Sequence, residues 1–353
     1  MLSSITYTHL SMKDKPRWNK LMNNSVYSSY RASMDYIYSK EITGRKVDTF
    51  VFQNDGKDIA GVHYSIKSSN FGLIKTSDIL SGIIFSEAIN ENILSYIIKH
   101  YLAWSKQKKT SYLRFSPWIP DTIGGEKNNH SNLFEIVLKL FGFEKINEGR
   151  HTYWLDLSIS GTELLAGMKK DTRYRIKQGT KSEMKILRID EHDDLVINKF
   201  WEFYKDLGAS KEFNLLSERN FKYMVTALLR AGEASLFLAV YKNEYVNIAM
   251  ASRNGIASYM YGAINPDFEK IESCPPPGHV TQWEMINTMK SLGLKVYDMG
   301  FCPGAVPYRE HPAYDIWRFK YGFGGKHVQF MPTYGKVLNP VTGRLFQFLK
   351  YRK

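Results

Sequence analysis

The residues best suited to chemistry lie in one stretch, residues 294–325, which reads LKVYDMGFCPGAVPYREHPAYDIWRFKYGFGG. Its first six residues alternate as a short β-strand does, and Asp298 stands near the end of that strand. After a proline-broken loop, Lys320 stands among glycines and aromatic residues. Because glycine lets a ligand approach the backbone, we expect Asp298 and Lys320 to meet in a cleft that admits a substrate. The alternative is that Asp298 caps the loop and Lys320 is solvated.

The two cysteines offer no second reactive centre. Cys274 and Cys302 form neither a disulfide framework nor a zinc-binding spacing. A nucleophilic cysteine needs a partnered base, and no such base can be named for Cys302. We therefore expect reduced, incidental thiols and no metal site.

The charge of the chain is informative. Its 353 residues carry a formal net charge of +13, which favours a polyanionic partner or an anionic membrane surface, because counterion release rewards each phosphate neutralised. No apolar run approaches the roughly 20 residues that cross a bilayer, and the first residues lack the apolar core of a signal peptide. The expected location is the cytoplasm.

The first half of the chain predicts one mixed α/β unit. Three strands, joined by tight turns at residues 54–56 and 70–72, precede a helix and a fourth strand. These elements are expected at residues 49–53, 59–67, 73–85, 87–105 and 111–115. A strand at residues 151–157 closes the unit.

The same order of elements returns in the second half of the chain. Three strands, a helix and a fourth strand are expected at residues 235–241, 245–252, 256–263, 281–293 and 294–299. Thr281 and Glu284 form a capping box that is expected to begin the helix, and Gly293 is expected to end it. The offset between the halves is 186 positions at the first strand and 183 at the last, which indicates a tandem duplication.

We therefore predict an α/β protein with mixed sheets, built from two tandem domains of one type with a cleft between them. The first domain is placed at residues 1–157 and the second at residues 158–331. A tail at residues 332–353 is expected to pack back on the first domain. The chain is expected to act as a monomer.

A basic helix is predicted where the two domains join. Ser160 and Glu163 form a capping box, and Gly179 is expected to end the helix that they begin. One face of this helix is apolar and the other is a cationic stripe. The stripe consists of Lys169, Lys170, Arg173 and Lys177.

This stripe has two interpretations. Most charged runs are solvated helix faces, but four like charges repel one another, so contact with phosphates is the functional alternative. Arg175 is counted with the residues expected to bind tRNA phosphates, although it projects into the apolar arc, where it either snorkels or pairs with a buried acid.

The motifs of the second half resemble the FemABX-like peptidyltransferases. The matching segments are YMYGA at 259–263, PPPGHVTQWEMI at 275–286, GLKVYDMG at 293–300 and WRFKYGFGG at 317–325. WLDLS at 154–158 and LLAGMKKDTRYRIKQG at 164–179 look like the domain junction of that family. The resemblance implies two tandem domains of the GCN5-related N-acetyltransferase (GNAT) type. It also implies transfer of an amino acid from aminoacyl-tRNA to an amine, with tRNA phosphates on the basic stripe.

The resemblance also implies roles for individual residues. The family's Phe-Lys pair matches Phe319 and Lys320, so Lys320 would stabilise the oxyanion and Phe319 would wall the acceptor or aminoacyl end. Tyr261 and Asp298, at adjacent strand ends, are candidates to orient the attacking amine, and Asp298 could also take its proton. The alternative for Tyr261 is an ordinary strand aromatic. In members that act on cell-wall precursors, the first domain contacts the acceptor's diphosphate, and the closest match here is Lys40. The acceptor is left open among a cell-wall precursor, another glycan and a peptide.

Two other functions remain as alternatives. An acyl-CoA-dependent N-acyltransferase could use the same fold, but residues 265–278 contain acids and three prolines instead of the usual Q/R-x-x-G-x-G/A phosphate loop. A non-catalytic RNA-binding module would explain the charge but not the matching site motifs. No cofactor beyond the donor substrate is expected.

Overall fold

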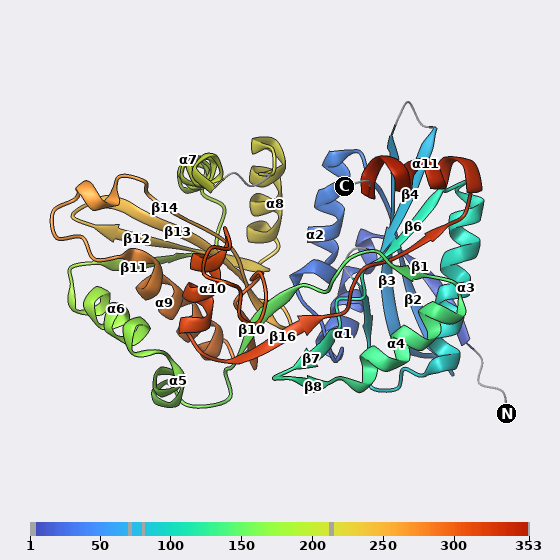
Figure 1. Ribbon diagram of the computed structural model, residues 1–353, viewed down its shortest axis with the longest axis horizontal. Coiled ribbons are helices and arrows are strands. Elements are labelled where there is room, and N and C mark those ends of the chain that lie inside the picture. Colours follow the sequence, from blue (N-terminus) through green and yellow to red (C-terminus); the bar gives the residue numbers. More distant parts are fainter. Residues whose placement is uncertain (1–4, 70–72, 80–81, 212–214, 352–353) are drawn as a thin grey trace. The chain divides into compact units, whose positions relative to one another are not determined.

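The chain forms two compact units in a computed structural model that describes residues 5–69, 73–79, 82–211 and 215–351 (Figure 1). The first unit combines Met1–Arg150 with Val328–Lys353, and the second is His151–His327. Residues 328–353 thus belong with the first half of the chain. In the described residues, no helix is long and apolar enough to cross a membrane.

The first unit is built on a mixed sheet. Its order is β1-β2-β3-β4-β6-β17-β9, with β5 also paired to β3. All neighbours are antiparallel except β4 and β6, which are parallel. The strands are β1 (Ile5–Leu10), β2 (Lys46–Asn54), β3 (Lys57–Ser69), β4 (Ile74–Ile79), β5 (Ile83–Phe85), β6 (Tyr112–Phe115), β9 (Glu144–Lys145) and β17 (Tyr334–Val337).

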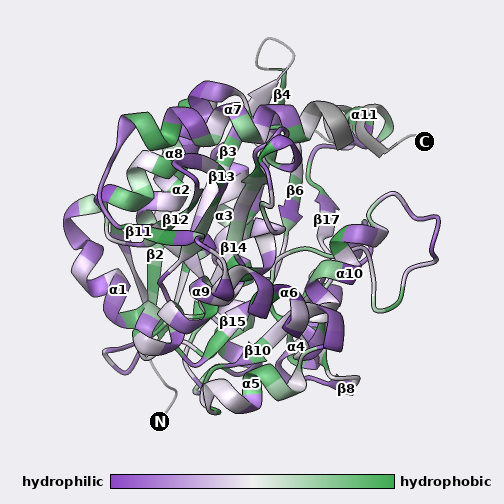
Figure 2. Ribbon diagram, turned by 90° about the vertical axis from the view of Figure 1, so that its left-hand side faces the viewer, coloured by the Kyte–Doolittle hydropathy of each residue, from purple (hydrophilic) through white to green (hydrophobic). Residues whose placement is uncertain are grey.

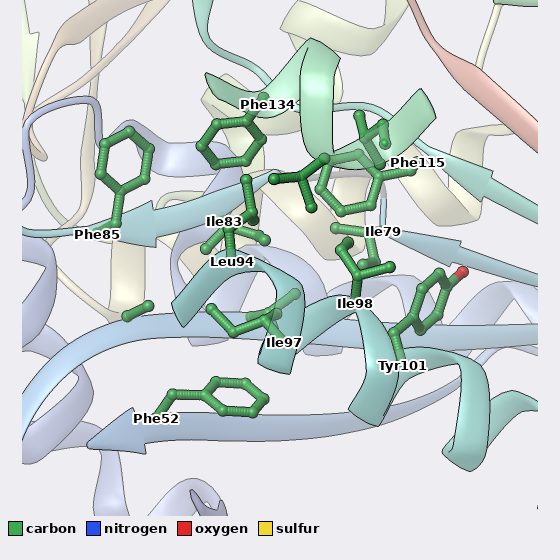
Figure 3. Close-up of a cluster of buried hydrophobic side chains, with 14 of the residues drawn as sticks. Phe52, Ile79, Ile83, Phe85, Leu94, Ile97, Ile98, Tyr101, Phe115 and Phe134 are labelled. Carbon is green, nitrogen blue, oxygen red and sulfur yellow. The ribbon is translucent and has the colours of Figure 1, made fainter. Parts of the chain in front are cut away.

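Helix α3 (Glu91–Gln107) forms the core of this unit with the sheet (Figure 3). Asn90 caps it by accepting from the Ile93 N–H. Its apolar stripe, with the spacing expected of an amphipathic helix, is fully buried and includes Leu94, Ile97 and Ile98. The predicted helix near residues 87–105 is therefore confirmed, beginning four residues later.

Smaller elements complete the first unit. They are α1 (Lys15–Asn23), α2 (Met34–Ser39), α4 (Asn129–Leu140), α11 (Pro340–Tyr351), β7 (Pro120–Ile123), β8 (Glu126–Lys127) and the short 3₁₀ helices η1 (Met12–Asp14), η2 (Tyr30–Ala32) and η3 (Lys40–Thr43). β1 and α1 were not predicted from the sequence. The predicted turn at residues 70–72 lies outside the described residues.

The second unit has a sheet of similar plan. Its order is β11-β12-β13-β14-β15-β10, and only β14 and β15 are parallel. The strands are β10 (His151–Asp156), β11 (Lys185–Ile189), β12 (Ala234–Tyr241), β13 (Glu244–Ser252), β14 (Ala257–Ile264) and β15 (Val296–Asp298). Strand β16 (Lys326–Phe330) begins in this unit, but its residues 328–330 belong to the first unit, where they pair with β7.

Seven helices belong to the described part of the second unit. They are α5 (Gly161–Gly167), α6 (Lys170–Lys181), α7 (Asp194–Lys211), α8 (Glu218–Arg230), η4 (Phe268–Lys270), α9 (Pro277–Ser291) and α10 (Tyr314–Gly322). Long hydrophobic stretches lie on the strands, while the helices alternate hydrophilic and hydrophobic residues (Figure 2). This is the amphipathic pattern of helices that cover a sheet.

The predicted duplication is confirmed by topology. In each unit three antiparallel strands are followed by a helix and by a strand parallel to the third: β2-β3-β4-α3-β6 in the first, and β12-β13-β14-α9-β15 in the second. The fold is thus α/β with two tandem domains of one type.

Two local expectations differ from the structure. The strand expected to close the first domain is β10, and it pairs with β15 of the second unit, so the contact boundary lies at residue 150 and not 157. Helix α9 begins at Pro277 and not at Thr281. The Thr281 hydroxyl donates to the Pro277 carbonyl (2.9 Å) inside the helix, so it caps nothing.

Asp78 forms two buried ion pairs in the first sheet. It is fully buried on β4 and accepts from Arg114, its neighbour on β6, and from Arg45 (2.6 Å). Burial alone would raise the pKa of this carboxyl, but the two arginines hold it below its usual value. Asp78→Asn should destabilise the protein by about 3–5 kcal/mol at neutral pH, because two guanidiniums lose their carboxylate. Urea unfolding measures this loss.

The matched control is Asp58→Asn, which breaks the half-exposed pair with Arg17 and should cost about 1 kcal/mol or less. The Asp78 contribution should persist at mildly acidic pH and disappear as the pH falls through the lowered pKa. Equal losses in the two variants would contradict this account.

Candidate active site

The candidate site lies where two parallel strands separate. β14 and β15 pair only at Ala257 with Tyr297 and at Ser258 with Asp298. Gly300 follows with a left-handed φ of 73°, and a Cβ there would lie 2.8 Å from the Tyr259 carbonyl oxygen. Only glycine fits this position, and the separated strands leave backbone groups for another partner.

That partner is Lys320, in the last turn of α10. Its side chain is only 7% exposed, and its Nζ donates to the Phe301 carbonyl at 2.7 Å. The Nζ lies 5.4 Å from the centroid of the Tyr259 ring. Burial lowers the pKa of Lys320 to about 8, although the charge of Asp298 acts in the opposite direction. Lys320 is therefore a buried ammonium that titrates close to neutral pH.

The structure brings Asp298 to the same place. One oxygen of its carboxylate accepts from the Thr152 hydroxyl and from the Gly300 N–H at 2.7 Å. The carboxylate thus fixes the turn that presents Phe301 to Lys320. Among the described residues no ion pair joins Asp298 to Lys320, so Asp298 acts on the ammonium through its charge.

Tyr261 does not accompany them. Its ring packs against Tyr204 and Phe221, at 5.6 Å from each. A β-bulge explains this, because Met250 pairs with Tyr261 while the next residue of β13 already pairs with Tyr259. The bulge brings Tyr259 to the ammonium, a contact that no sequence pattern reveals.

Phe319 and its neighbouring glycines pack within the unit. The Phe319 ring contacts His279 at 5.0 Å and Phe323 at 5.2 Å. A Cβ at Gly324 would lie 2.6 Å from the Gly167 carbonyl oxygen, and Gly325 is similarly crowded by β10. These glycines therefore allow backbone packing, which differs from the substrate wall expected from the sequence.

Cys302 is not a nucleophile. It is fully buried, its Sγ lies 3.5 Å from the Gly304 carbonyl, and burial raises its pKa to about 11. Nor does any group of three His, Cys, Asp or Glu in the described residues have the arrangement to hold a metal ion.

The predicted basic helix is two helices. The capping box of Ser160 and Glu163 is present and begins α5, but α5 ends at Gly167 and α6 begins at Lys170. Met168 and Lys169 between them are extended, with ψ of 156° and 150°. A single helical wheel therefore does not describe the stripe.

Because the helix is interrupted at residues 168–169, the basic residues have different contacts. Arg173 donates to the Met168 carbonyl and so caps the end of α5. Lys169 lies 4.6 Å from the centroid of the Tyr321 ring. Arg175 pairs with the exposed Asp171 (3.1 Å), not with a buried acid. Lys170 and Lys177 are exposed, and no ion pair of the described residues includes them.

Lys40 lines a cavity of about 180 Å³ in the first unit. The wall also includes Arg31, Arg150, Trp118 and Glu148, so two cations from the start of the chain converge there with one more than 100 residues later. Of these three cations only Lys40 is predicted from the sequence, because the two arginines come together with it only through the fold.

The pKa of Tyr36 indicates the positive charge around Lys40. Its hydroxyl accepts from Lys40 Nζ at 3.0 Å, and its side chain is 7% exposed. Burial alone would raise the pKa of Tyr36, but Lys40, Arg31 and Arg150 lower it to about 8. The positive potential therefore outweighs the desolvation of the phenolate, as expected of an anion site.

The second unit matches a family model described as an acetyltransferase (GNAT) domain, over residues 166–310. Together with the repeated topology, this identifies the architecture as two tandem GNAT-like domains. No curated protein sequence matches the chain.

Solved structures share this architecture over the whole chain. FemX superposes with a TM-score of 0.83 at 16% identity, covering 98% of this chain and 100% of FemX. A tandem GNAT protein from the clavulanic acid biosynthesis pathway gives 0.54 at 10% identity, with 96% and 99% covered. The C-terminal domain of a protein assigned as a lysylphosphatidylglycerol synthetase in Agrobacterium fabrum gives 0.57 at 12%, with 95% and 94% covered. The predicted FemABX-like resemblance is confirmed at the level of the fold.

The burial of Lys320 predicts a pH-dependent stability. Its folded pKa of about 8 lies below the ordinary 10.5, so the unfolded chain holds the proton more tightly. Below pH 8 the buried charge destabilises the fold by on the order of 3 kcal/mol, and this penalty vanishes as pH rises to 10.5. Lys320→Met should therefore be more stable at pH 7, by about 1–3 kcal/mol after the lost hydrogen bond is counted.

Denaturant unfolding between pH 7 and 10 checks this expectation. The stability difference between Lys320→Met and the wild type should shrink as pH rises. The exposed Lys170→Met is the control and should show no such trend. A Lys320→Met protein that is less stable at pH 7 would contradict the assignment of a buried, costly ammonium.

Proposed function

We propose that this chain is an aminoacyltransferase that moves an amino acid from aminoacyl-tRNA to an amine. The observation that supports this best is the state of Lys320. An ammonium has three N–H donors, and in the described part of the chain only the Phe301 carbonyl accepts from it. The remaining donors can bind an oxyanion in a site of low dielectric, where such stabilisation is strongest.

The proposed reaction is an acyl transfer. The neutral amine nitrogen attacks the ester carbonyl carbon, and a C–N bond forms while the C–O bond to the tRNA ribose breaks. The proton lost by the amine balances the one gained by the ribose hydroxyl. Lys320 stabilises the intermediate oxyanion, and Asp298 keeps the Gly300 turn in place. Orientation of the amine by Tyr261 stays a prediction that its ring contacts do not support. Tyr259 lies nearer.

The donor is proposed to be an aminoacyl-tRNA for two reasons. The site motifs resemble those of FemABX-like proteins, and the fold also occurs in the lysylphosphatidylglycerol synthetase homologue. The exposed Lys170 and Lys177 supply uncompensated positive charge in the same unit, suited to phosphates. Lys169, Arg173 and Arg175 have partners within the protein, so we give them a smaller share of this binding than the sequence suggested.

The acceptor is proposed to carry an anionic group that enters the Lys40 cavity. Lys40, Arg31 and Arg150 would bind it, which fits a phosphate-bearing cell-wall precursor better than a neutral glycan or peptide. We further propose that the protein acts in the cytoplasm as a monomer. Its net charge of +13 also suits contact with an anionic membrane surface.

An acyl-CoA donor is the second candidate, because the matching family model is an acetyltransferase domain. Phosphates of CoA would need free N–H groups at a helix N-terminus. Helix α9 instead begins at Pro277 and follows Pro275 and Pro276, so its N-cap and its first residue have no N–H. At α3 the Asn90 side chain already accepts from the Ile93 N–H. The N-termini of α9 and α3 therefore both argue against acyl-CoA as the donor.

A transfer assay tests the proposal directly. Purified protein receives radiolabelled aminoacyl-tRNAs and a panel of amine acceptors that includes cell-wall precursors. Product should form, should disappear with RNase and should not form with acetyl-CoA. Turnover with acyl-CoA instead would overturn the tRNA donor and keep the fold.

The charge of Lys320 predicts a bell-shaped pH profile. Activity should rise with pH as the acceptor amine loses its proton, and fall as pH rises through about 8, where Lys320 becomes neutral. Lys320→Ala should lower kcat by about 10²–10³-fold, as removal of an oxyanion donor does. Lys320→Arg should move the alkaline fall to higher pH.

Binding of tRNA by Lys320→Ala should equal that of the wild type, which separates catalysis from a purely RNA-binding function. Unchanged turnover in Lys320→Ala would contradict the role of this residue.

The exposed lysines of α6 predict a salt effect. The affinity for tRNA should fall steeply with ionic strength, and the slope of its logarithm should decrease by about one for each phosphate contact removed. Lys170→Gln/Lys177→Gln should therefore reduce the slope by about two. The control, Lys205→Gln/Lys295→Gln, removes two exposed lysines elsewhere in the same unit. Equal slopes in both double variants would exclude α6 from the tRNA surface.

A further inference from the structure

Trp118 has an unusual backbone for a residue with a large side chain. Its φ is 54°, in the left-handed region. The segment is anchored where the Ser116 N–H donates to the Ile79 carbonyl at 2.9 Å. Gly82 approaches so closely that a Cβ there would lie 2.0 Å from the Pro117 carbonyl oxygen. Conformations that the surroundings impose in this way concentrate at ligand sites.

This conformation brings the indole ring beneath two guanidinium groups. The Cζ of Arg31 lies 4.1 Å from the ring centroid and the Cζ of Arg150 lies 5.4 Å from it. Phe330 packs edge-on against the same ring, with 5.2 Å between the ring centroids and 69° between the ring planes. Indole is the best side-chain surface for a cation. One ring therefore positions two arginines at the wall of the Lys40 cavity.

The two guanidiniums repel each other. Desolvation and the charge of Arg31 lower the pKa of Arg150. Glu148 is the acidic residue in the cavity wall, but no ion pair in the described part of this unit includes Arg150 or Lys40. Two cations held together on one ring are stabilised when an anion lies between them.

We propose that Trp118 is the positioning residue of this cavity, and that its ring holds Arg31 and Arg150 where both can bind a phosphate-class oxyanion of the acceptor. The inference rests on the proposed function for the identity of the acceptor. The anion itself can be tested without any donor. Arginine suits this role because its planar, permanently charged fork binds two oxygens of a phosphate group at once.

Calorimetric titration of the full chain with pyrophosphate, at fixed ionic strength, tests this proposal. Trp118→Leu removes the π surface and should weaken binding about tenfold, whereas Trp118→Phe should stay within about threefold of the wild type. Trp201→Leu, a partly exposed tryptophan of the second unit, is the matched control and should change nothing. Undiminished binding in a folded Trp118→Leu, or no binding by the wild type, would overturn the proposal.

A second variant covers the case in which Trp118→Leu does not fold. Gly82→Ala displaces the Pro117–Trp118 peptide while the ring remains, and it should also weaken pyrophosphate binding. Phenolate absorbance gives an independent signal, because Tyr36 should titrate at higher pH once the arginines are no longer held nearby. A Gly82→Ala protein with wild-type affinity and titration would contradict the positioning role.

Steady-state transfer separates this inference from the proposed function. Trp118→Leu should raise the KM for the acceptor and leave kcat nearly unchanged, since the proposal gives the ring a part in acceptor binding and none in the chemical step. Transfer with an unchanged KM would overturn the positioning role and leave the function standing. Pyrophosphate binding that depends on Trp118, in a protein that transfers nothing, would support the positioning role and overturn the function.

Discussion

The buried ammonium of Lys320 is the constraint on which the second unit is organised. A charge with 7% exposure needs a partner, and the separation of β14 from β15 supplies it by freeing the Phe301 carbonyl. Asp298 fixes the turn through the Gly300 N–H, and its charge favours the protonated form of Lys320. The bulge in β14 places the Tyr259 ring against the same group. The strand separation, the Gly300 turn and the β-bulge therefore all place groups around one ammonium, that of Lys320.

The two units share a topology but differ at the equivalent position. In the first unit β4 and β6 stay paired over four residues, and Asp78 lies opposite Arg114 with its carboxylate bound to that guanidinium. In the second unit the parallel pair opens after Ser258. An ion pair across the ladder keeps the first sheet closed, whereas the open sheet of the second unit accommodates an ammonium. The two repeats therefore differ in what lies at the parallel pair, an ion pair in the first and a buried ammonium in the second, although both sheets have a similar strand order.

The sequence predicts the features that depend on local patterns. Strand alternation, the amphipathic stripe of α3 and the glycine-lysine motif around Lys320 are all visible along the chain, and they led to the repeated α/β units and to the placing of Asp298 with Lys320. The incorrect predictions have one cause: tertiary packing decides small local deviations of the backbone from regular helix and strand. A single extra residue in β14 places the Tyr259 ring, instead of the expected Tyr261, against Lys320. Two extended residues divide the predicted basic helix into α5 and α6. Arg31 and Arg150 were missed because they converge only through the fold.

The choice of cation at the two places follows from what each must bind. The anion that we propose for the Lys40 cavity carries a permanent charge, so arginines that keep their own charge at any working pH suit stable binding. At Lys320 negative charge would exist only while the carbonyl is being attacked, and binding that is equally strong before and after this step would not accelerate it. A lysine whose pKa is lowered to about 8 holds its proton weakly, so it gains most when an oxyanion forms beside it. In the proposed reaction, burial therefore adjusts this lysine to a transient charge, and the Phe301 carbonyl freed by the separated strands offsets part of the cost of that burial.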